Sequence, residues 1–191
     1  MHPILQLNRD REAARANSDP CANLCTVATV DSAGEPQART MVLREVEQNL
    51  ALFGNATSPK WQQIANQGLV CIVVWLPSLG VQYRLRCKAD PVPKNLIDDS
   101  WLLRPRMPKQ LDWYYATKAA QSSTLDSRTA LLTDLSTLDQ AEHQTAPATA
   151  QGWYLTPKHV DRLDLNHPSG VHERCAFDLV DGDWQASPLV P

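Results

Sequence analysis

Long apolar runs are absent from this sequence of 191 residues. The longest one, LVCIVVWL at 69–76, is far shorter than the roughly 20 apolar residues that a membrane-spanning helix needs. The N-terminal stretch MHPILQLNRDREAAR becomes charged early and lacks the apolar core of a secretory signal. These two absences predict a cytoplasmic protein.

Glycine-rich catalytic and nucleotide-binding motifs are also absent. The seven glycines form neither a Walker phosphate loop nor the G-x-S-x-G turn of many hydrolases. Strands do not alternate with helices behind a glycine-rich turn, which disfavours a Rossmann domain. Kinase and hydrolase functions therefore have no support in the sequence.

Cysteine and histidine show no pattern that would hold a metal ion or a disulfide framework. The five cysteines are an odd number without a repeated spacing, and Cys21 and Cys25 do not have the spacing of a zinc knuckle. The histidines lack ligand spacing as well. We expect buried free thiols and no metal site.

Excess charge of one sign is small, because the net charge is −3. Together with an aromatic content of 6%, this disfavours a nucleic-acid binder built on Arg84, Arg86 and Lys88. Residues 36–109 nevertheless carry ten Lys/Arg and five Asp/Glu, a net of +5, which leaves −8 for the remainder. An anion site in this segment and an uneven solvated surface both explain the distribution.

What the sequence does contain is a series of short β-branched and alternating segments with helical segments in the middle. Strands are expected at 24–30, 37–46, 50–54, 69–76 and 81–89, with three or four short ones after 152. A leading helix is expected within 1–20, further helices at 55–68, 93–103, 108–120 and 122–143, and a flexible loop at 145–152. The pattern predicts one α+β domain over 1–191, mainly β, built as an antiparallel barrel with flanking helices.

Two arginines bracket a short apolar strand in ARTMVLRE (38–45). In a regular strand Arg39 and Arg44 point to opposite faces and stand roughly 16 Å apart, so one small anion cannot contact both. An elongated ligand could use both of them. On an exposed strand they would be solubilising charges.

A helix start follows this strand, with Ser58 at the N-cap and Pro59 at the first helical position. The free backbone N–H groups and the positive dipole end of such a helix favour a phosphate. Arg39 and Lys60 beside it would complete a phosphate pocket. The alternative is two unrelated surface charges and a helix cap.

Polar residues on two later strands could contact a ring system. Gln82 shares a strand face with Arg84 and Arg86, and its amide can both donate and accept hydrogen bonds at the edge of a heterocycle. His172 and Arg174 also share a strand face, which suggests a contact with an anion or with a ring.

Several segments, in order, resemble pyridoxamine 5'-phosphate oxidase and above all its FMN-binding, split-barrel relatives. They are ATVDSAGEPQARTMVLRE, LFGNATSPKWQQIA, VVWLPSLGVQYRLRCKA, LLRPR, AQSS, HER and a terminal W-x-x-x-P-L-x-P, between residues 22 and 191. The resemblance implies an antiparallel split β-barrel that binds FMN at the interface of a homodimer. It also implies an FMN-dependent oxidoreductase that acts on a small molecule.

The resemblance assigns roles to individual residues, with the flavin phosphate at Arg39 and Lys60. The flavin contacts that it implies are Arg39, Thr40, Met41, Val42, Leu43, Arg44, Phe53, Gly54, Lys60, Gln82, Gln121, Ser122 and Arg174. Gln121 and Ser122 would reach the flavin across the dimer interface. Arg44, Arg104 and His172 would line the substrate side.

The sequence departs from the family mainly where phosphate and substrate bind. The replacements are Pro59 for an arginine, Ser100 for a tyrosine, Pro108 for a serine, Asp164 for a tryptophan and Gly170 for an arginine. Pyridoxamine 5'-phosphate is therefore not expected to be the substrate. Two functions stay open: a flavoenzyme with an unidentified small-molecule substrate, and a non-catalytic module that holds FMN or haem.

Overall fold

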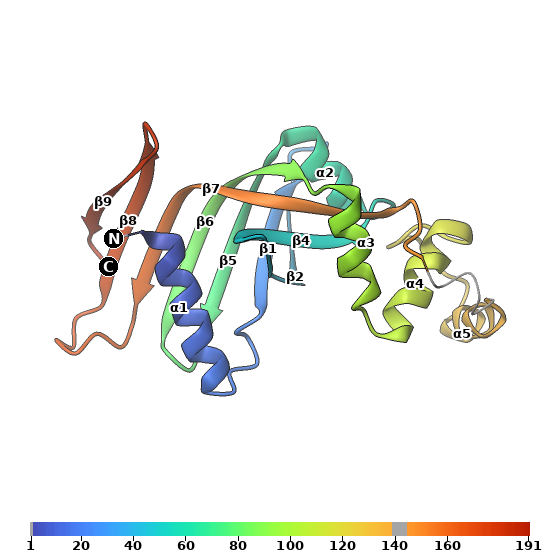
Figure 1. Ribbon diagram of the computed structural model, residues 1–191, viewed down its shortest axis with the longest axis horizontal. Helices are drawn as coiled ribbons and strands as arrows, with labels where there is room; N and C mark the ends of the chain where they lie inside the picture. Colours follow the sequence, from blue (N-terminus) through green and yellow to red (C-terminus); the bar gives the residue numbers. More distant parts are fainter. Residues whose placement is uncertain (1, 139–144) are drawn as a thin grey trace.

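The computed structural model describes residues 2–138 and 145–191, which build a curled antiparallel sheet flanked by helices (Figure 1). The strands are β1 (Leu24–Val30), β2 (Pro36–Val42), β3 (Arg44–Val46), β4 (Asn49–Asn55), β5 (Leu69–Leu76), β6 (Val81–Pro91), β7 (Ala150–Asp164), β8 (Glu173–Val180) and β9 (Asp183–Leu189). The helices are α1 (Pro3–Ala16), α2 (Pro59–Gln67), α3 (Lys94–Leu102), α4 (Arg106–Thr117) and α5 (Arg128–Thr137). The α+β prediction is therefore confirmed.

The long strand β7 organises the sheet, whose order is β2-β1-β5-β6-β7-β4-β3. One edge of β7 pairs with β6. The other edge is shared, because residues 150–155 pair with β4 and residues 159–164 pair with β8. As a result β8 and β9 lie at one end of the molecule, and α3, α4 and α5 lie at the other (Figure 1).

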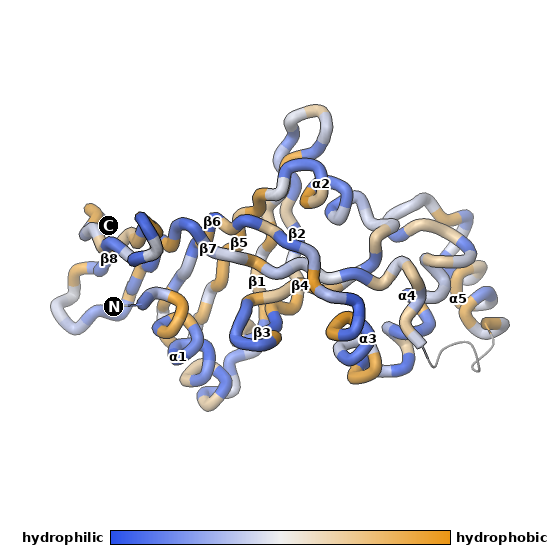
Figure 2. Tube along the Cα trace, turned by 45° about the horizontal axis from the view of Figure 1, so that its top comes forward, coloured by the Kyte–Doolittle hydropathy of each residue, from blue (hydrophilic) through white to orange (hydrophobic). Residues whose placement is uncertain are grey.

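The core of the sheet follows from strand alternation. Every second residue of β5 and β6 is buried, including Ile72, Val74, Tyr83 and Leu85. Helix α1 adds Leu7 to this core, and α2 adds a pair of apolar residues from one face. Figure 2 shows hydrophobic positions recurring among hydrophilic ones along the central strands.

Most of the expected elements are confirmed, with corrections near their ends. Helix α2 runs between Ser58 and Gly68, whose φ of +63° is the left-handed conformation that glycine adopts most easily. Of the helix expected at 122–143, only Arg128–Thr137 is helical among the described residues, and 139–144 lie outside them.

The C-terminal part contains fewer breaks than the sequence suggested. The first two of the short strands expected after 152, at 153–157 and 160–165, are one strand of 15 residues, β7, and it starts at Ala150 inside the loop expected at 145–152. The flexibility of the rest of that loop and the single domain over 1–191 stay predictions.

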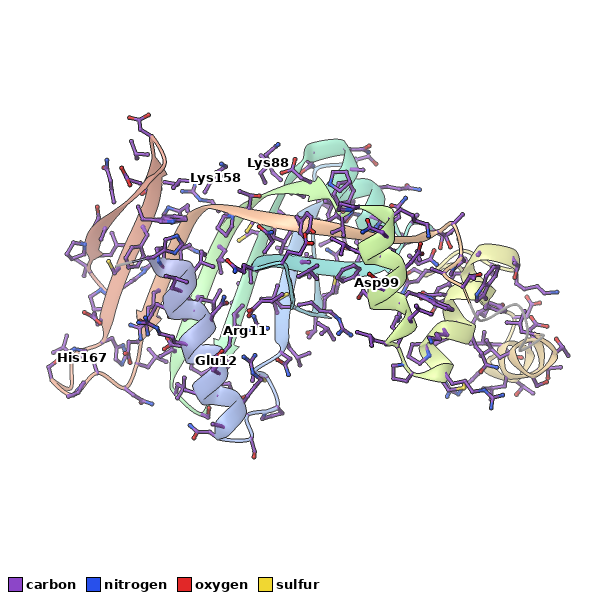
Figure 3. The ribbon with its side chains drawn as sticks, in the orientation of Figure 1. Arg11, Glu12, Lys88, Asp99, Lys158 and His167 are labelled. Carbon is purple, nitrogen blue, oxygen red and sulfur yellow. The ribbon has the colours of Figure 1, made fainter. Side chains whose placement is uncertain are left out.

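The single strand expected at 37–46 is wrong, because the chain changes partners at Leu43. Its N–H donates to the carbonyl oxygen of Asn23 (2.9 Å), and its carbonyl oxygen accepts from Nη2 of Arg11 (2.8 Å). Arg11 is buried, points from α1 toward the strands beside it (Figure 3), and also pairs with Glu45. Before the break β2 pairs with β1, and after it β3 pairs with β4.

Three further properties concern membrane spans, metal ions and thiols. No helix in the described part of the chain is long and apolar enough to cross a membrane. Residues 2–138 and 145–191 contain no group of three or more His, Cys, Asp or Glu side chains that could hold a metal ion. All five cysteines are free, with Cys25 and Cys87 buried and the other three partly buried.

Candidate functional site

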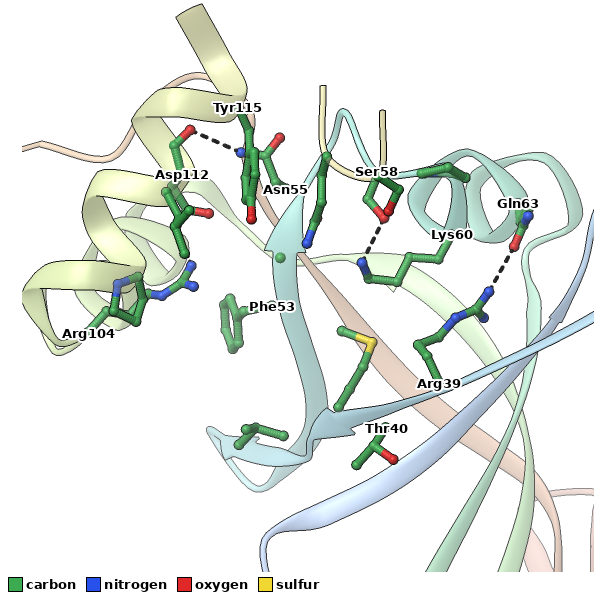
Figure 4. A pocket seen from close by; sticks show the side chains of 18 of the residues that line it. Arg39, Thr40, Phe53, Asn55, Ser58, Lys60, Gln63, Arg104, Asp112 and Tyr115 are labelled. Atoms are coloured by element: carbon green, nitrogen blue, oxygen red, sulfur yellow. Dashed lines mark hydrogen bonds and ion pairs between the residues drawn. The ribbon is translucent and has the colours of Figure 1, made fainter. Parts of the chain in front are cut away.

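A cavity of about 770 Å³ lies between β2, β4, the start of α2 and the helices α3 and α4. It brings together eleven of the residues predicted for the site: Arg39, Thr40, Met41, Val42, Arg44, Phe53, Gly54, Lys60, Arg104, Gln121 and Ser122. Figure 4 shows Arg39, Ser58, Lys60 and Gln63 on one side, which we call the Arg39 wall, and Arg104, Asp112 and Tyr115 on the other, which we call the Arg104 wall.

The Arg39 wall carries two cations whose hydrogen bonds go only to neutral oxygens. Arg39 donates from Nη1 to Oγ1 of Thr29 (2.6 Å) and from Nη2 to Oε1 of Gln63 (3.4 Å). Lys60 donates from Nζ to Oγ of Ser58 (2.7 Å). Neither cation forms an ion pair with any residue that the structure describes. The wall therefore presents two uncompensated positive charges at the start of α2.

Burial and mutual repulsion disfavour these charges. Burial lowers the pKa of Arg39. It also lowers the pKa of Lys60, and the positive charge of Arg39 lowers it further. A bound anion would reverse both effects, and the N-terminus of α2 would add free N–H groups and its dipole.

The strand β4 forms the floor of the cavity with Phe53 and Gly54. Phe53 pairs with Gly152 on β7, where a Cβ would stand only 2.9 Å from Cε1 of the Phe53 ring. A Cβ on Gly54 would stand 3.1 Å from Cη2 of Trp61. The two glycines thus allow the Phe53 and Trp61 rings to approach the backbone, which fixes the shape of the floor.

The Arg104 wall carries an arginine that is already paired with a carboxylate. Nη1 of Arg104 contacts Oδ2 of Asp112, and the same oxygen accepts from Nε1 of Trp101 (3.1 Å). Asn55 donates from Nδ2 to the backbone carbonyl oxygen of Asp112 (3.3 Å; Figure 4). Burial raises the pKa of Asp112 and the charge of Arg104 opposes this rise, while burial and then Asp112 raise the pKa of Tyr115.

Asp112 was not predicted from the sequence. The signal was present, because Asp112 is the single acidic residue of α4 and lies between Leu111 and Trp113. Its partner Arg104 is eight residues away in the loop between α3 and α4, so no helical spacing rule joins them. The contact follows from the turn between the two helices.

Gln121 and Ser122 line the cavity of the same chain as Arg39. The backbone N–H of Gln121 donates to Oγ1 of Thr57 (3.0 Å), which holds this segment against the start of α2. The expectation that this pair comes from a second copy is therefore corrected, because one chain places it in the cavity.

Four other predicted residues do not line this cavity. The side chain of Leu43 is 1% exposed and belongs to the core. Gln82 and Arg174 align across β6, β7 and β8, each opposite Leu163, and His172 is exposed just before β8. The three polar residues thus form a second group, on the part of the sheet that continues into β8.

Arg174 in this second group is strongly held. It donates to Asp161 from Nε (3.1 Å) and from Nη2 (2.8 Å), and Arg84 contacts the same carboxylate (2.8 Å). These hydrogen bonds and charges lower the pKa of Asp161. Two cations share this one acid, so Asp161 compensates only one of the charges of Arg84 and Arg174.

Three of the five residues that depart from the family pattern line the cavity, and the other two lie at the end of β7 and in the turn after it. Pro59, Ser100 and Pro108 line the cavity. Asp164 accepts from Arg162 at the end of β7, and Gly170 lies in the turn that follows, with a φ of +75°.

Comparison with known proteins identifies relatives over the whole chain. The family model described as pyridoxamine 5'-phosphate oxidase matches residues 13–140. A pyridoxine/pyridoxamine 5'-phosphate oxidase of Pseudomonas entomophila (strain L48) is 28% identical, over 89% of this chain and 79% of that protein. The one from Synechocystis sp. (strain ATCC 27184 / PCC 6803 / Kazusa) is 26% identical, over 100% of this chain and 88% of that protein.

Solved structures share the fold at lower sequence identity. PhzG from Burkholderia lata 383, in complex with tetrahydrophenazine-1-carboxylic acid, has a TM-score of 0.83 and 20% identity, over 100% of this chain and 93% of that one. A pyridoxamine 5'-phosphate oxidase-related, FMN binding protein from Nostoc punctiforme PCC 73102 has a TM-score of 0.74 and 19% identity, over 98% and 94%. The chain belongs to the pyridoxamine 5'-phosphate oxidase family of FMN-binding split barrels.

Proposed function

We propose that the chain binds FMN with its phosphate on the Arg39 wall and acts as an oxidoreductase on a small molecule. The observation that carries this proposal is the pair of cations Arg39 and Lys60, which face the start of α2 without an acidic partner among the described residues. A phosphate monoester carries about −1.5 to −2 charges near neutral pH, which matches two cations.

The size and lining of the cavity also fit a flavin nucleotide. Ligand pockets commonly measure about 300–1,000 Å³, and this one measures about 770 Å³. Phe53, Gly54, Gln121 and Ser122 offer an apolar floor and polar groups for the part of the ligand beyond its phosphate. Bound FMN would supply hydride and electron transfer, and these residues would bind and orient it.

We further propose a homodimer with the flavin at its interface. Gln82, His172 and Arg174 belong to the second group, so they would reach the flavin of a cavity only from another copy of the chain. Exposed apolar side chains on β2 and β5 support such an interface, namely Val42, Leu69 and Trp75.

The visible spectrum of the freshly purified protein tests the cofactor. We expect flavin absorbance, release of FMN on denaturation, and a higher Tm with added FMN, because a ligand that binds only the folded state stabilises it. A colourless protein whose Tm does not respond to FMN would contradict the proposal.

Mixed dimers test the shared site. Arg39→Ala and Arg174→Ala each remove one contributor from every site of a homodimer, so we expect both variants to lose flavin. A mixed dimer, co-expressed with two affinity tags, regains one intact site and should hold one FMN. Absence of flavin from the mixed dimer would rule out the shared site.

A second candidate is a module on the same barrel that holds FMN or haem without turnover. It is favoured by the closed contact between Arg104 and Asp112, which leaves a predicted substrate contact already occupied. It predicts ligand uptake, no reduction of the flavin by reduced nicotinamide cofactors and no oxidation of pyridoxamine 5'-phosphate. Steady turnover in either assay would exclude it.

A further inference from the structure

The ion pair between Arg104 and Asp112 changes what the cavity can bind. The Asp112 side chain is 3% exposed and that of Arg104 is 27% exposed. Nε1 of Trp101 donates to the same carboxylate oxygen as Arg104 does. Burial raises the pKa of Asp112, and the two donors on its oxygen oppose this rise. The ionised form of Asp112 then uses the charge of Arg104 before any ligand arrives.

This ion pair determines which charges of the cavity lining are left for ligands. The lining contains the cations Arg39, Lys60, Arg44 and Arg104 and a single acid among the described residues, Asp112. Arg104 and Asp112 cancel, and Arg39 and Lys60 match the phosphate of FMN under the proposed function. Among the cations of the chain's own lining, one is left for a second ligand: the exposed Arg44 on β3, for which no ion pair is formed within the described chain. Arg174, which the proposed dimer would bring from another copy, is already bound by Asp161.

The surface near Arg104 is otherwise largely apolar or neutral. Pro108 and Leu111 line it from α4, and Phe53 lies between the two walls (Figure 4). Tyr115 contributes a phenol whose raised pKa keeps it neutral. Such a surface accepts a flat ring and offers it few hydrogen-bond donors.

We propose that Asp112 sets the specificity of this site by neutralising Arg104, so that the cavity takes a flat substrate with a single carboxylate and rejects phosphate esters. A carboxylate carries one negative charge and matches Arg44 alone. A phosphate ester carries about −1.5 to −2 charges, so part of its charge would be desolvated without a partner. The proposal rests on the proposed function, because FMN is taken to occupy the Arg39 wall.

Asp112 could instead serve only to join α4 to α3. The two roles differ in what Asp112→Asn does, because asparagine keeps an oxygen that can accept from Trp101 but removes the charge. A purely structural role predicts a change in stability without a change in the preference between anions. A role in specificity predicts that freeing Arg104 changes that preference.

The test uses two probes with the same ring, 1-naphthoate and 1-naphthyl phosphate, titrated by calorimetry into the FMN-loaded protein at mildly alkaline pH. The wild-type protein should bind naphthoate about fivefold or more tightly than naphthyl phosphate. In Asp112→Asn the ratio of the two dissociation constants should shift by about tenfold or more toward the phosphate, the value of one charge-assisted contact. Asp98→Asn, on the exposed ion pair between Lys94 and Asp98, is the matched control and should leave the ratio unchanged.

Three results would overturn the proposal: a wild-type protein that prefers naphthyl phosphate, a wild-type protein that binds neither probe, and an unchanged ratio in Asp112→Asn. If Asp112→Asn does not fold, two measurements still test the proposal. They are the ratio of the two dissociation constants in the wild-type protein and the expected loss of naphthoate binding in Arg44→Gln. If the protein does not take up FMN, the proposed function fails separately. The ratio of the naphthoate and naphthyl phosphate dissociation constants is then measured in the double variant Arg39→Ala, Lys60→Met. This variant has no cation on the Arg39 wall that could bind the phosphate of the probe.

Discussion

The two walls of the cavity hold an arginine in opposite ways. Arg39 extends from a strand and donates to neutral oxygens of Thr29, Val27 and Gln63. Arg104 lies between two helices and donates to the buried carboxylate of Asp112. The first arginine keeps its full charge for a ligand, whereas the second is neutralised inside the protein. An arginine in a cavity therefore indicates an anion site only if it has no acidic partner within the protein.

The largest expected effect concerns the ion pair of the Arg104 wall and is a change in the free energy of unfolding. Asp112→Ala leaves Arg104 and Trp101 without their shared acceptor, which should cost about 3 kcal/mol of unfolding free energy, the low end for a broken buried pair because Arg104 is partly solvated. Asp98→Ala breaks the exposed pair with Lys94 and should cost less than about 1 kcal/mol. Urea unfolding of both variants measures the difference. Equal losses would mean that Asp112 is not held as the structure shows it.

The same contrast separates what could be predicted from sequence from what could not. The strand at 24–30 and the helix start at Ser58 and Pro59 follow from alternation and capping, which are local. The break at Leu43 depends on Arg11, 32 residues away, whose Nη2 binds the Leu43 carbonyl oxygen. No period in the sequence connects two such positions, so the strand was predicted as continuous.

In the candidate site, too, local features were predicted and contacts between separate segments were not. The cations Arg39 and Lys60 were expected together, because Arg39 lies on a strand and Lys60 at the start of the helix that comes later in the chain, and the cavity brings them together. The Arg104 wall was predicted as a substrate contact without its acid, because the pair with Asp112 forms only when α4 folds back beside α3. Gln82 and Arg174 were correctly placed on strands, but their distance from the cavity depends on how β7 divides its edge between β4 and β8.

Flavin affinity should depend on the Arg39 wall far more than on Arg44. Arg39→Ala removes a charge-assisted hydrogen bond to the phosphate and should weaken FMN binding by about 1.5–3 kcal/mol, while Arg44→Ala should leave it nearly unchanged. Titration of FMN with a fluorescence readout measures both. Arg9→Ala, an exposed arginine on α1 outside the cavity lining, controls for a general loss of charge. Equal losses in Arg39→Ala and Arg44→Ala would show that the phosphate does not sit where we propose.

The pH dependence of FMN binding should report on Lys60. Its pKa is lowered in the free protein by burial and by Arg39, and a bound phosphate would raise it. Affinity should therefore be full below the lowered pKa and decline as pH rises through it, by less than about tenfold for one partly replaced charge. Lys60→Arg keeps its charge at every accessible pH, so its affinity should not decline. The same decline in both proteins would assign it to another group.

The smallest effect should come from adding a third cation to the Arg39 wall. Pro59 occupies the first position of α2, is exposed and lines the cavity. Pro59→Arg should tighten FMN binding by about 0.5 kcal/mol, because an exposed charge near a phosphate is screened and its side chain must be ordered. The variant should also lose some of its free energy of unfolding, because proline at this position restricts the unfolded chain. If Pro59→Arg instead tightened FMN binding as strongly as Arg39→Ala weakens it, two cations would be too few for the phosphate. The charge balance that leaves only Arg44 for the substrate would then be incorrect.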